Sequence, residues 1–213
     1  MPSQTPTMHE SDLLLVIDPQ LDFCATGRLA VADGDAVMPL INQLALRFEH
    51  IVLTQDWHPA GHSSFASTHL GRQPFETIQA VYGPQTLWPD HCIQGSPGAQ
   101  FHPDLDIPHV ELILRKGFRP AIDSYSAFTE NDKTTPTGLA GYLHERGFKR
   151  IFLAGLAYDY CVRFSAVDAV RSGFEVFVFE DACRSVGLGS SVADTQREFA
   201  EMGIIRLTTA EMA

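Results

Sequence analysis

The sequence has no long apolar run, no closely paired cysteines and few basic residues. No stretch approaches the roughly 20 apolar residues that a membrane-spanning helix needs, and the first ten residues lack the basic and apolar regions of a signal peptide. Lys and Arg number 15 against 26 Asp and Glu, a formal net charge of −11. Because such a field repels phosphate backbones and anionic lipids, we expect neither nucleic acid nor a membrane as a partner.

The few cysteines point to a reducing compartment. Cys24, Cys92, Cys161 and Cys183 are scattered without a CxxC pair, a pattern that favours free thiols over disulfides. We therefore expect a cytoplasmic protein. The length of 213 residues predicts a single domain over 1–213, with a polar and loose segment at 1–12.

Short apolar runs alternate with segments of helical periodicity. Strands are expected at 13–17, 51–54, 112–114, 151–154, 176–179 and 204–207, and helices at 36–48, 137–146, 161–171 and 191–202. This alternation predicts an α/β fold: an open parallel sheet of about six strands with helices on both faces, in three layers. Residues 56–109 contain no clear long element, and such an irregular insertion in a compact domain is usually functional.

Polar side chains follow four of these strands. Asp18 follows the first, Asp56 and His58 the second, Lys116 the third, and Cys161 comes shortly after the fourth. Ligands of open α/β sheets bind outside the carboxyl ends of the strands. We therefore expect these side chains to converge on one edge of the sheet.

Cys161 stands at the expected start of a helix. Asp159 is a candidate N-cap, which puts Cys161 in the first turn, where free N–H groups and the positive helix end stabilise a thiolate or an oxyanion. Asp18 would accept the thiol proton, and Lys116 would keep that carboxylate ionised. A buried small hydrophobe, a loop carboxylate and a solvated lysine are the alternative interpretations of these residues.

The segment Asp56-Trp57-His58 brings a carboxylate and an imidazole together at short spacing. His91 could supply a second imidazole, and His62 is an additional candidate. Such ligands suit zinc, iron or manganese, and three of them would leave open positions for water or substrate.

Five ordered blocks carry a family resemblance. They cover residues 16–24, 55–65, 87–95, 115–128 and 155–162. In these blocks the sequence resembles the nicotinamidases, also called pyrazinamidases, among the isochorismatase-like cysteine hydrolases. The resemblance implies that fold, and it implies a catalytic triad of Asp18, Lys116 and Cys161.

The resemblance also assigns the residues around the triad. It implies one divalent metal ion on Asp56, His58 and His91, with His62 matching a ligand of only some relatives. It implies a cis peptide bond between Leu156 and Ala157, which would bring the N–H groups of Ala157 and Cys161 together as an oxyanion hole. The expected ring pocket consists of Phe23, Trp88 and Tyr125. One departure is Tyr158, where relatives commonly have Thr.

The implied reaction deamidates nicotinamide to nicotinate and ammonia through a thioester on Cys161, in NAD salvage, and pyrazinamide is a further expected substrate. The pyridine nitrogen would bind the metal. One alternative is a related amidase acting on a ureido or carbamoyl compound. Another is a binding protein on the same fold. The sequence leaves the oligomeric state open, homo-oligomers included.

Overall fold

The computed structural model describes residues 6–212. At its centre is a six-stranded parallel sheet in the order β5-β2-β1-β6-β7-β8. Its strands are β1 (Asp12–Ile17), β2 (His50–Asp56), β5 (Leu112–Lys116), β6 (Arg150–Leu156), β7 (Glu175–Arg184) and β8 (Ile205–Leu207). The helices are α1 (Met38–Ala45), α2 (Leu139–Glu145), α3 (Arg163–Arg171) and α4 (Ser191–Met202). The predicted fold class is confirmed.

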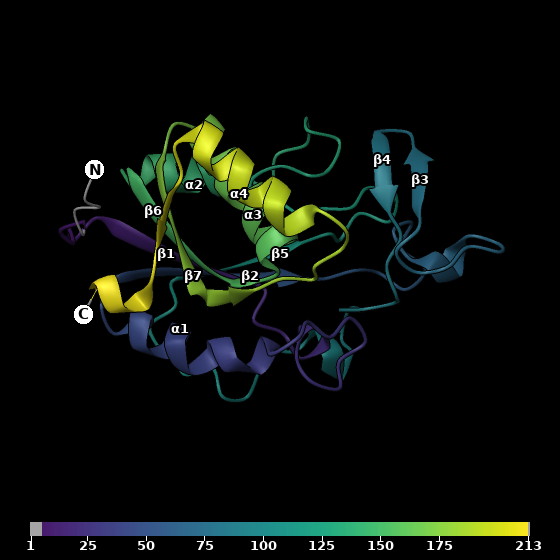
Figure 1. Ribbon diagram of the computed structural model, residues 1–213, viewed down its shortest axis with the longest axis horizontal. Coiled ribbons are helices and arrows are strands. Elements are labelled where there is room, and N and C mark those ends of the chain that lie inside the picture. Colours follow the sequence, from purple (N-terminus) through teal and green to yellow (C-terminus); the bar gives the residue numbers. More distant parts are fainter. Residues whose placement is uncertain (1–5, 213) are drawn as a thin grey trace.

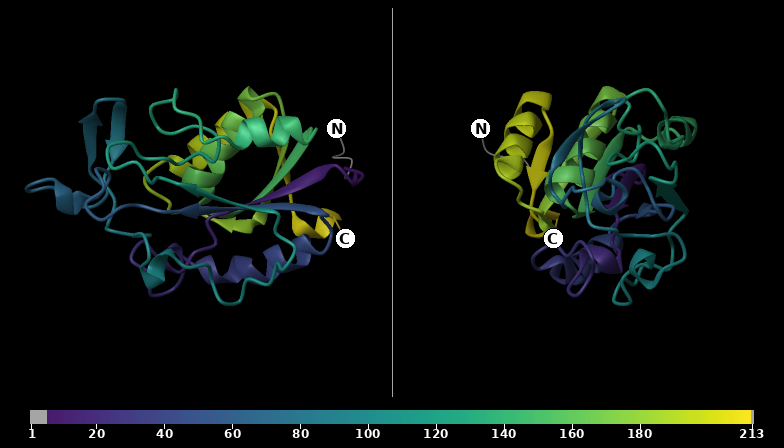
Figure 2. Two further views of the ribbon diagram at one scale, coloured as in Figure 1. Left: turned by 180° about the vertical axis from the view of Figure 1, so that it is seen from behind. Right: turned by 90° about the vertical axis from the view of Figure 1, so that its right-hand side faces the viewer.

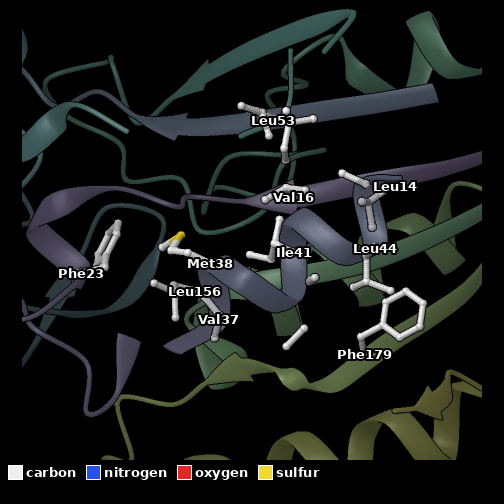
Figure 3. Close-up of a cluster of buried hydrophobic side chains, with 14 of the residues drawn as sticks. Leu14, Val16, Phe23, Val37, Met38, Ile41, Leu44, Leu53, Leu156 and Phe179 are labelled. Atoms are coloured by element: carbon white, nitrogen blue, oxygen red, sulfur yellow. The ribbon is translucent and has the colours of Figure 1, made fainter. Parts of the chain in front are cut away.

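The central strand β1 explains the three layers. All six of its residues are buried, as expected for an apolar run without alternation in a parallel sheet. Leu14 and Val16 face α1 and pack with Ile41 and Leu44 (Figure 3). Leu13, Leu15 and Ile17 point to the opposite face, into the core that α2, α3 and α4 cover.

The helices lie unevenly on the two faces. Figures 1 and 2 show α1 on one face of the sheet and α2, α3 and α4 on the other. Each has between 7 and 12 residues. No helix within residues 6–212 is long and apolar enough to cross a membrane.

The insertion expected at 56–109 contains an antiparallel hairpin that we did not predict. Strands β3 (Thr77–Ala80) and β4 (Gly83–Thr86) pair with each other and project from the body of the molecule (Figure 1). Each strand has four residues, β4 contains Pro84, and β3 is exposed or half-buried throughout. Neither segment therefore carries the apolar alternation that marks a longer strand.

Several boundaries also differ from expectation. β1 begins at Asp12, inside the segment expected to be loose. The helix expected over 36–48 is a 3-10 turn followed by α1. The remaining 3-10 turns among the described residues lie at Leu21–Phe23, Ala66–Thr68, Pro97–Ala99 and Thr209–Met212.

The start of α3 has an unexpected form. A π-helical turn, Tyr158–Val162, precedes α3, and Ala157 takes the N-cap position. The N-cap prediction for Asp159 was wrong, because its carboxylate instead accepts the N–H groups of Val186 and Gly187 and the hydroxyl of Ser191. Asp159 therefore anchors the loop that leads into α4 to the start of α3.

Candidate active site

A buried lysine lies at the centre of the site. Lys116 ends β5, and its ammonium nitrogen is 2.6 Å from Asp56 Oδ1 and 2.8 Å from Asp18 Oδ2. The same nitrogen donates to the carbonyl of Ser124 (3.0 Å) and lies 3.4 Å from Cys161 Sγ. One cation thus joins two carboxylates and a thiol that come from three other segments distant in sequence.

This arrangement drives the pKa values of the two carboxyl groups apart. Burial raises the pKa of Asp18, and the nearby Asp56 adds to that rise, while Lys116 opposes it. Burial also acts to raise the pKa of Asp56, but Lys116 and His58 outweigh it and hold that pKa well below its usual value. Asp56 is therefore the ionised partner of Lys116, and Asp18 is the better proton acceptor.

Lys116 itself keeps its proton. Burial acts to lower the pKa of its ammonium group, but Asp18 and Asp56 raise it well above the usual value. The sequence predicts that Lys116 keeps Asp18 ionised. The structure instead shares its charge between two carboxylates, the closer of which is Asp56.

Asp18 is fixed by a neighbouring strand. It follows β1 with φ of 45°, a left-handed conformation that Asp tolerates better than most residues. Its N–H donates to Thr54 Oγ1 at 3.0 Å, and the Thr54 hydroxyl donates back to Asp18 Oδ1 at 2.5 Å. One oxygen of the carboxylate is thereby committed to Thr54, while the other faces Lys116.

Cys161 is a buried thiol in the π-helical turn. Burial raises its pKa well above the usual value, Lys116 counteracts this, and Asp18 adds to it. Cys161 therefore rests as a protonated thiol near neutral pH, instead of the thiolate that the helix start suggested, and needs a base before it can attack. The expected cis peptide bond between Leu156 and Ala157 is confirmed.

Three side chains beside Lys116 form a candidate metal centre. Asp56 Oδ2 lies 3.5 Å from His58 Nε2 and 3.7 Å from His91 Nε2. The Nδ1 atom of each imidazole is 2.8 Å from a backbone carbonyl, of Gly117 for His58 and of Pro89 for His91. Because Nδ1 donates to these carbonyls, both Nε2 lone pairs are free to converge with Asp56 on one ion. The residues therefore fit a divalent metal with open coordination positions.

Gly117 is required beside this centre. It has φ of 68°, and a Cβ there would lie 2.5 Å from the His58 ring. The residue after Lys116 must therefore be glycine if His58 is to reach the site.

His62 is placed differently. Its Nδ1 accepts from the N–H of Ser64 at 3.2 Å, and its Nε2 faces the carbonyls of Arg119 (2.9 Å) and Ile122 (3.2 Å). Burial and the nearby His58 lower its pKa, so the ring is neutral. With both nitrogens engaged, His62 packs behind His58 at a centroid distance of 4.4 Å.

A narrow pocket lies beside Cys161 and the candidate metal centre, with a volume of about 340 Å³ that includes its open mouth. Its walls include the three expected ring-binding residues, Phe23, Trp88 and Tyr125, together with Asp56, His91, Ala157 and Cys161. The pocket is also lined by four residues that are not predicted from the sequence: Leu29, Asp123, Tyr160 and Val186. Tyr160 could have been found, since it directly precedes Cys161, whereas Leu29 and Val186 reach the pocket from loops that carry no signal in the sequence.

The aromatic walls meet edge to face. Trp88 lies 4.8 Å from Tyr160 and 6.1 Å from Tyr125 between ring centroids, with interplanar angles of 86° and 82°. Such pairs are favourable beyond the area that they bury. The pocket therefore suits a flat and largely apolar ring.

Tyr158, the departure from the family pattern, points elsewhere. Its hydroxyl donates to Glu180 of β7 at 2.5 Å, and its ring contacts Phe199 of α4 edge to face. Its side chain therefore supports the packing of β7 and α4 against the nucleophile turn and is not among the pocket-lining residues.

Residues 12–211 match the family described as the isochorismatase domain. The chain belongs to the isochorismatase family. Within that family it is 50% identical to the nicotinamidase of Acinetobacter baylyi, over 92% of each chain, and 42% identical to that of Escherichia coli, over 94% of each.

Solved structures of isochorismatase-family members are similar to the structure of this chain. An Acinetobacter baumannii nicotinamidase and pyrazinamidase superimposes with a TM-score of 0.96 and 51% identity, covering 97% of this chain and 100% of that one. The pyrazinamidase of Pyrococcus horikoshii, solved in complex with zinc, gives a TM-score of 0.75 and 33% identity, covering 93% of this chain and 99% of that one.

Proposed function

We propose that this protein is a nicotinamidase, which hydrolyses nicotinamide to nicotinate and ammonia in NAD salvage, and that it also hydrolyses pyrazinamide. One observation carries the proposal: the Cys161 thiol lines an aromatic pocket while its sulfur lies 3.4 Å from a lysine shared by two carboxylates. The nicotinamidases named above, at 42–51% identity, support the same substrate.

The pocket accounts for recognition of the ring. Phe23, Trp88 and Tyr125 offer the apolar surface that a small aromatic amide needs. A divalent metal ion held by Asp56, His58 and His91 would act as a Lewis acid toward the pyridine nitrogen and so orient the ring. Zinc is the first candidate because the Pyrococcus relative was solved with it, ahead of iron and manganese.

Asp18 and Cys161 carry the chemistry. The Asp18 carboxylate, whose pKa is raised, takes the proton of the thiol as Sγ bonds to the carboxamide carbon. The N–H groups of Ala157 and Cys161 hold the oxyanion. Asp18 then gives the proton to the departing amine, which leaves as ammonia. It later takes a proton from the water that attacks the thioester and returns it to the Cys161 sulfur as the C–S bond breaks and nicotinate is released. Lys116 balances the charge of Asp18 and Asp56 throughout.

We also propose that the protein acts in the cytoplasm. All four cysteines are buried and free, which suits a reducing compartment.

Ammonia release tests the function. The purified protein loaded with zinc, iron or manganese is incubated with nicotinamide, with pyrazinamide and with a ureido compound, each with and without a chelator. We expect ammonia from the two aromatic amides only, and loss of activity with the chelator. Ammonia from the ureido compound alone would favour the related amidase instead.

A further inference from the structure

Gln85 is a buried polar residue that lies outside the five blocks of family resemblance and has no role in the proposed mechanism. It lies on β4 of the projecting hairpin and is 1% exposed. It is not among the pocket-lining residues, yet its side chain contacts two of them, Asp123 and Tyr125, from behind.

The amide nitrogen of Gln85 faces three acceptors. They are Asp123 Oδ2 at 2.9 Å, the Tyr125 hydroxyl oxygen at 2.9 Å and the Thr86 carbonyl at 2.7 Å. Its two hydrogens are therefore shared among three groups, two of which line the pocket.

The amide oxygen of Gln85 completes the network. It accepts from the Tyr82 hydroxyl at 3.0 Å and from Asn131 Nδ2 at 3.1 Å. Because a carboxylate and a carbonyl face one end of the amide and an amide donor faces the other, only one orientation of Gln85 satisfies all its neighbours.

The same network holds Tyr125 at two points. Asn131, which donates to Gln85, also accepts the N–H of Tyr125 at 3.1 Å. The Tyr125 hydroxyl accepts from Trp88 Nε1 at 3.1 Å in addition to Gln85. Gln85, the Tyr125 hydroxyl and Trp88 Nε1 therefore form one chain of hydrogen bonds that joins two ring-binding walls.

We infer that Gln85 is a positioning residue that sets the affinity of the pocket for the substrate ring, by fixing Tyr125 and, through it, Trp88. This rests on the proposed function, in which that pocket holds nicotinamide. Gln85 touches neither Cys161 nor Lys116, so it governs how the ring is held and not the step that breaks the amide bond. The projecting hairpin is thereby a support for the pocket wall.

The test compares Gln85→Leu with Gln79→Leu, which removes an exposed amide from β3 of the same hairpin. Loss of the hydrogen bonds from Gln85 should raise KM for nicotinamide about tenfold and leave kcat within about threefold, since the pocket walls hold the ring in both ground and transition state. The Kd for nicotinate, measured by calorimetry, should rise by the same factor. Gln79→Leu should change neither.

A purely structural role predicts another result. If Gln85→Leu lowers Tm but leaves KM and the nicotinate Kd within twofold of the wild type, the inference is overturned. Failure of the proposed function is distinct, because the wild-type protein would then release no ammonia from nicotinamide at all.

A double-mutant cycle tests the route through Tyr125. Tyr125→Phe removes the hydroxyl that Gln85 contacts, so adding Gln85→Leu to it should raise KM by clearly less than Gln85→Leu does in the wild type. Additive effects would contradict the inference. If Gln85→Leu does not fold, the shorter amide in Gln85→Asn replaces it in the same cycle, with the same expectations.

Discussion

The two halves of the site are constructed in different ways. At the carboxyl end of the sheet, Asp18 and Lys116 are buried and form an ion pair at 2.8 Å, and the buried Cys161 thiol lies 3.4 Å from the lysine. In the segment after β2, His91 and Trp88 are held by a hydrogen bond from an imidazole to a backbone carbonyl and by aromatic edges. The first half contains buried charged groups that neutralise one another, and the second half forms the metal centre and the aromatic wall of the pocket.

This difference predicts two kinds of damage. Removing Asp18 or Lys116, the charged members of the sheet half, leaves a buried charge without its partner, so both stability and the chemical step should suffer. Removing a member of the other half takes away a ligand or a wall while the charges stay balanced. Metal content and KM should then change more than folding.

The largest effect is expected from Cys161→Ala. The nucleophile is lost, so kcat should fall by at least about 10⁴-fold, while metal content stays at the wild-type level because Cys161 is not one of the three proposed ligands. Ammonia release and elemental analysis measure the two quantities. Turnover near the wild-type rate would contradict a thioester mechanism.

A smaller loss of activity is expected from Asp18→Asn and Lys116→Met. The first variant removes a negative charge from the site and the second removes a positive charge. Both variants should lose about 10²–10³-fold in kcat, in the range of general acid–base catalysis.

The rate at which iodoacetamide alkylates Cys161 rises with pH as the thiolate forms. Asp18→Asn removes a neighbouring negative charge that raises the pKa of Cys161, so the profile should shift to lower pH. Lys116→Met removes the positive charge that lowers this pKa and should shift it to higher pH.

Alkylation of Cys161 is measured by mass spectrometry of the peptide that contains it. The Cys161→Ala variant is the control for alkylation of the other three cysteines. Lys116→Met should also destabilise the fold by about 3–5 kcal/mol, because Asp18 and Asp56 lose their shared cation. Shifts in the same direction for both variants would contradict the proposed electrostatics.

His91→Ala should act on the metal and not on the fold. Loss of one of three ligands should weaken zinc binding by more than about 100-fold, since even the loss of an outer partner of a ligand costs 10–100-fold. Zinc titration against a competing chelator measures this, and Tm of the metal-free proteins provides the control. Unchanged zinc affinity would remove His91 from the proposed ligands.

The smallest effect is expected from His62→Gln. Both ring nitrogens of His62 already have protein partners, so zinc affinity and kcat should stay within about threefold of the wild type. Unfolding free energy should fall by about 1–3 kcal/mol, since Ser64, Arg119 and Ile122 lose a buried hydrogen-bond partner. A loss of zinc affinity as large as that of His91→Ala would make His62 a ligand.

What the sequence could predict follows the same division. The strands and the convergence of their carboxyl ends come from buried apolar runs and strand–helix alternation, which are local patterns. The β3–β4 hairpin escaped because its four-residue strands bury little, and Leu29 and Val186 escaped because loop paths decide their place. The raised pKa of Asp18 also depends on the fold, because only the fold shows that this carboxyl group is buried and lies near Asp56, with which it shares Lys116.

One dipeptide serves both halves of the site. Lys116 sends its side chain to the carboxylates and the thiol, and Gly117 offers its carbonyl to His58 while leaving room for that ring. Both residues lie at the end of β5, an edge strand of the sheet with a neighbour on one side only. If β5 detaches by local unfolding, the nucleophile loses its cation and the metal centre loses the support of His58 in a single event. Heat inactivation should therefore proceed in one step, with metal release and loss of activity following the same time course.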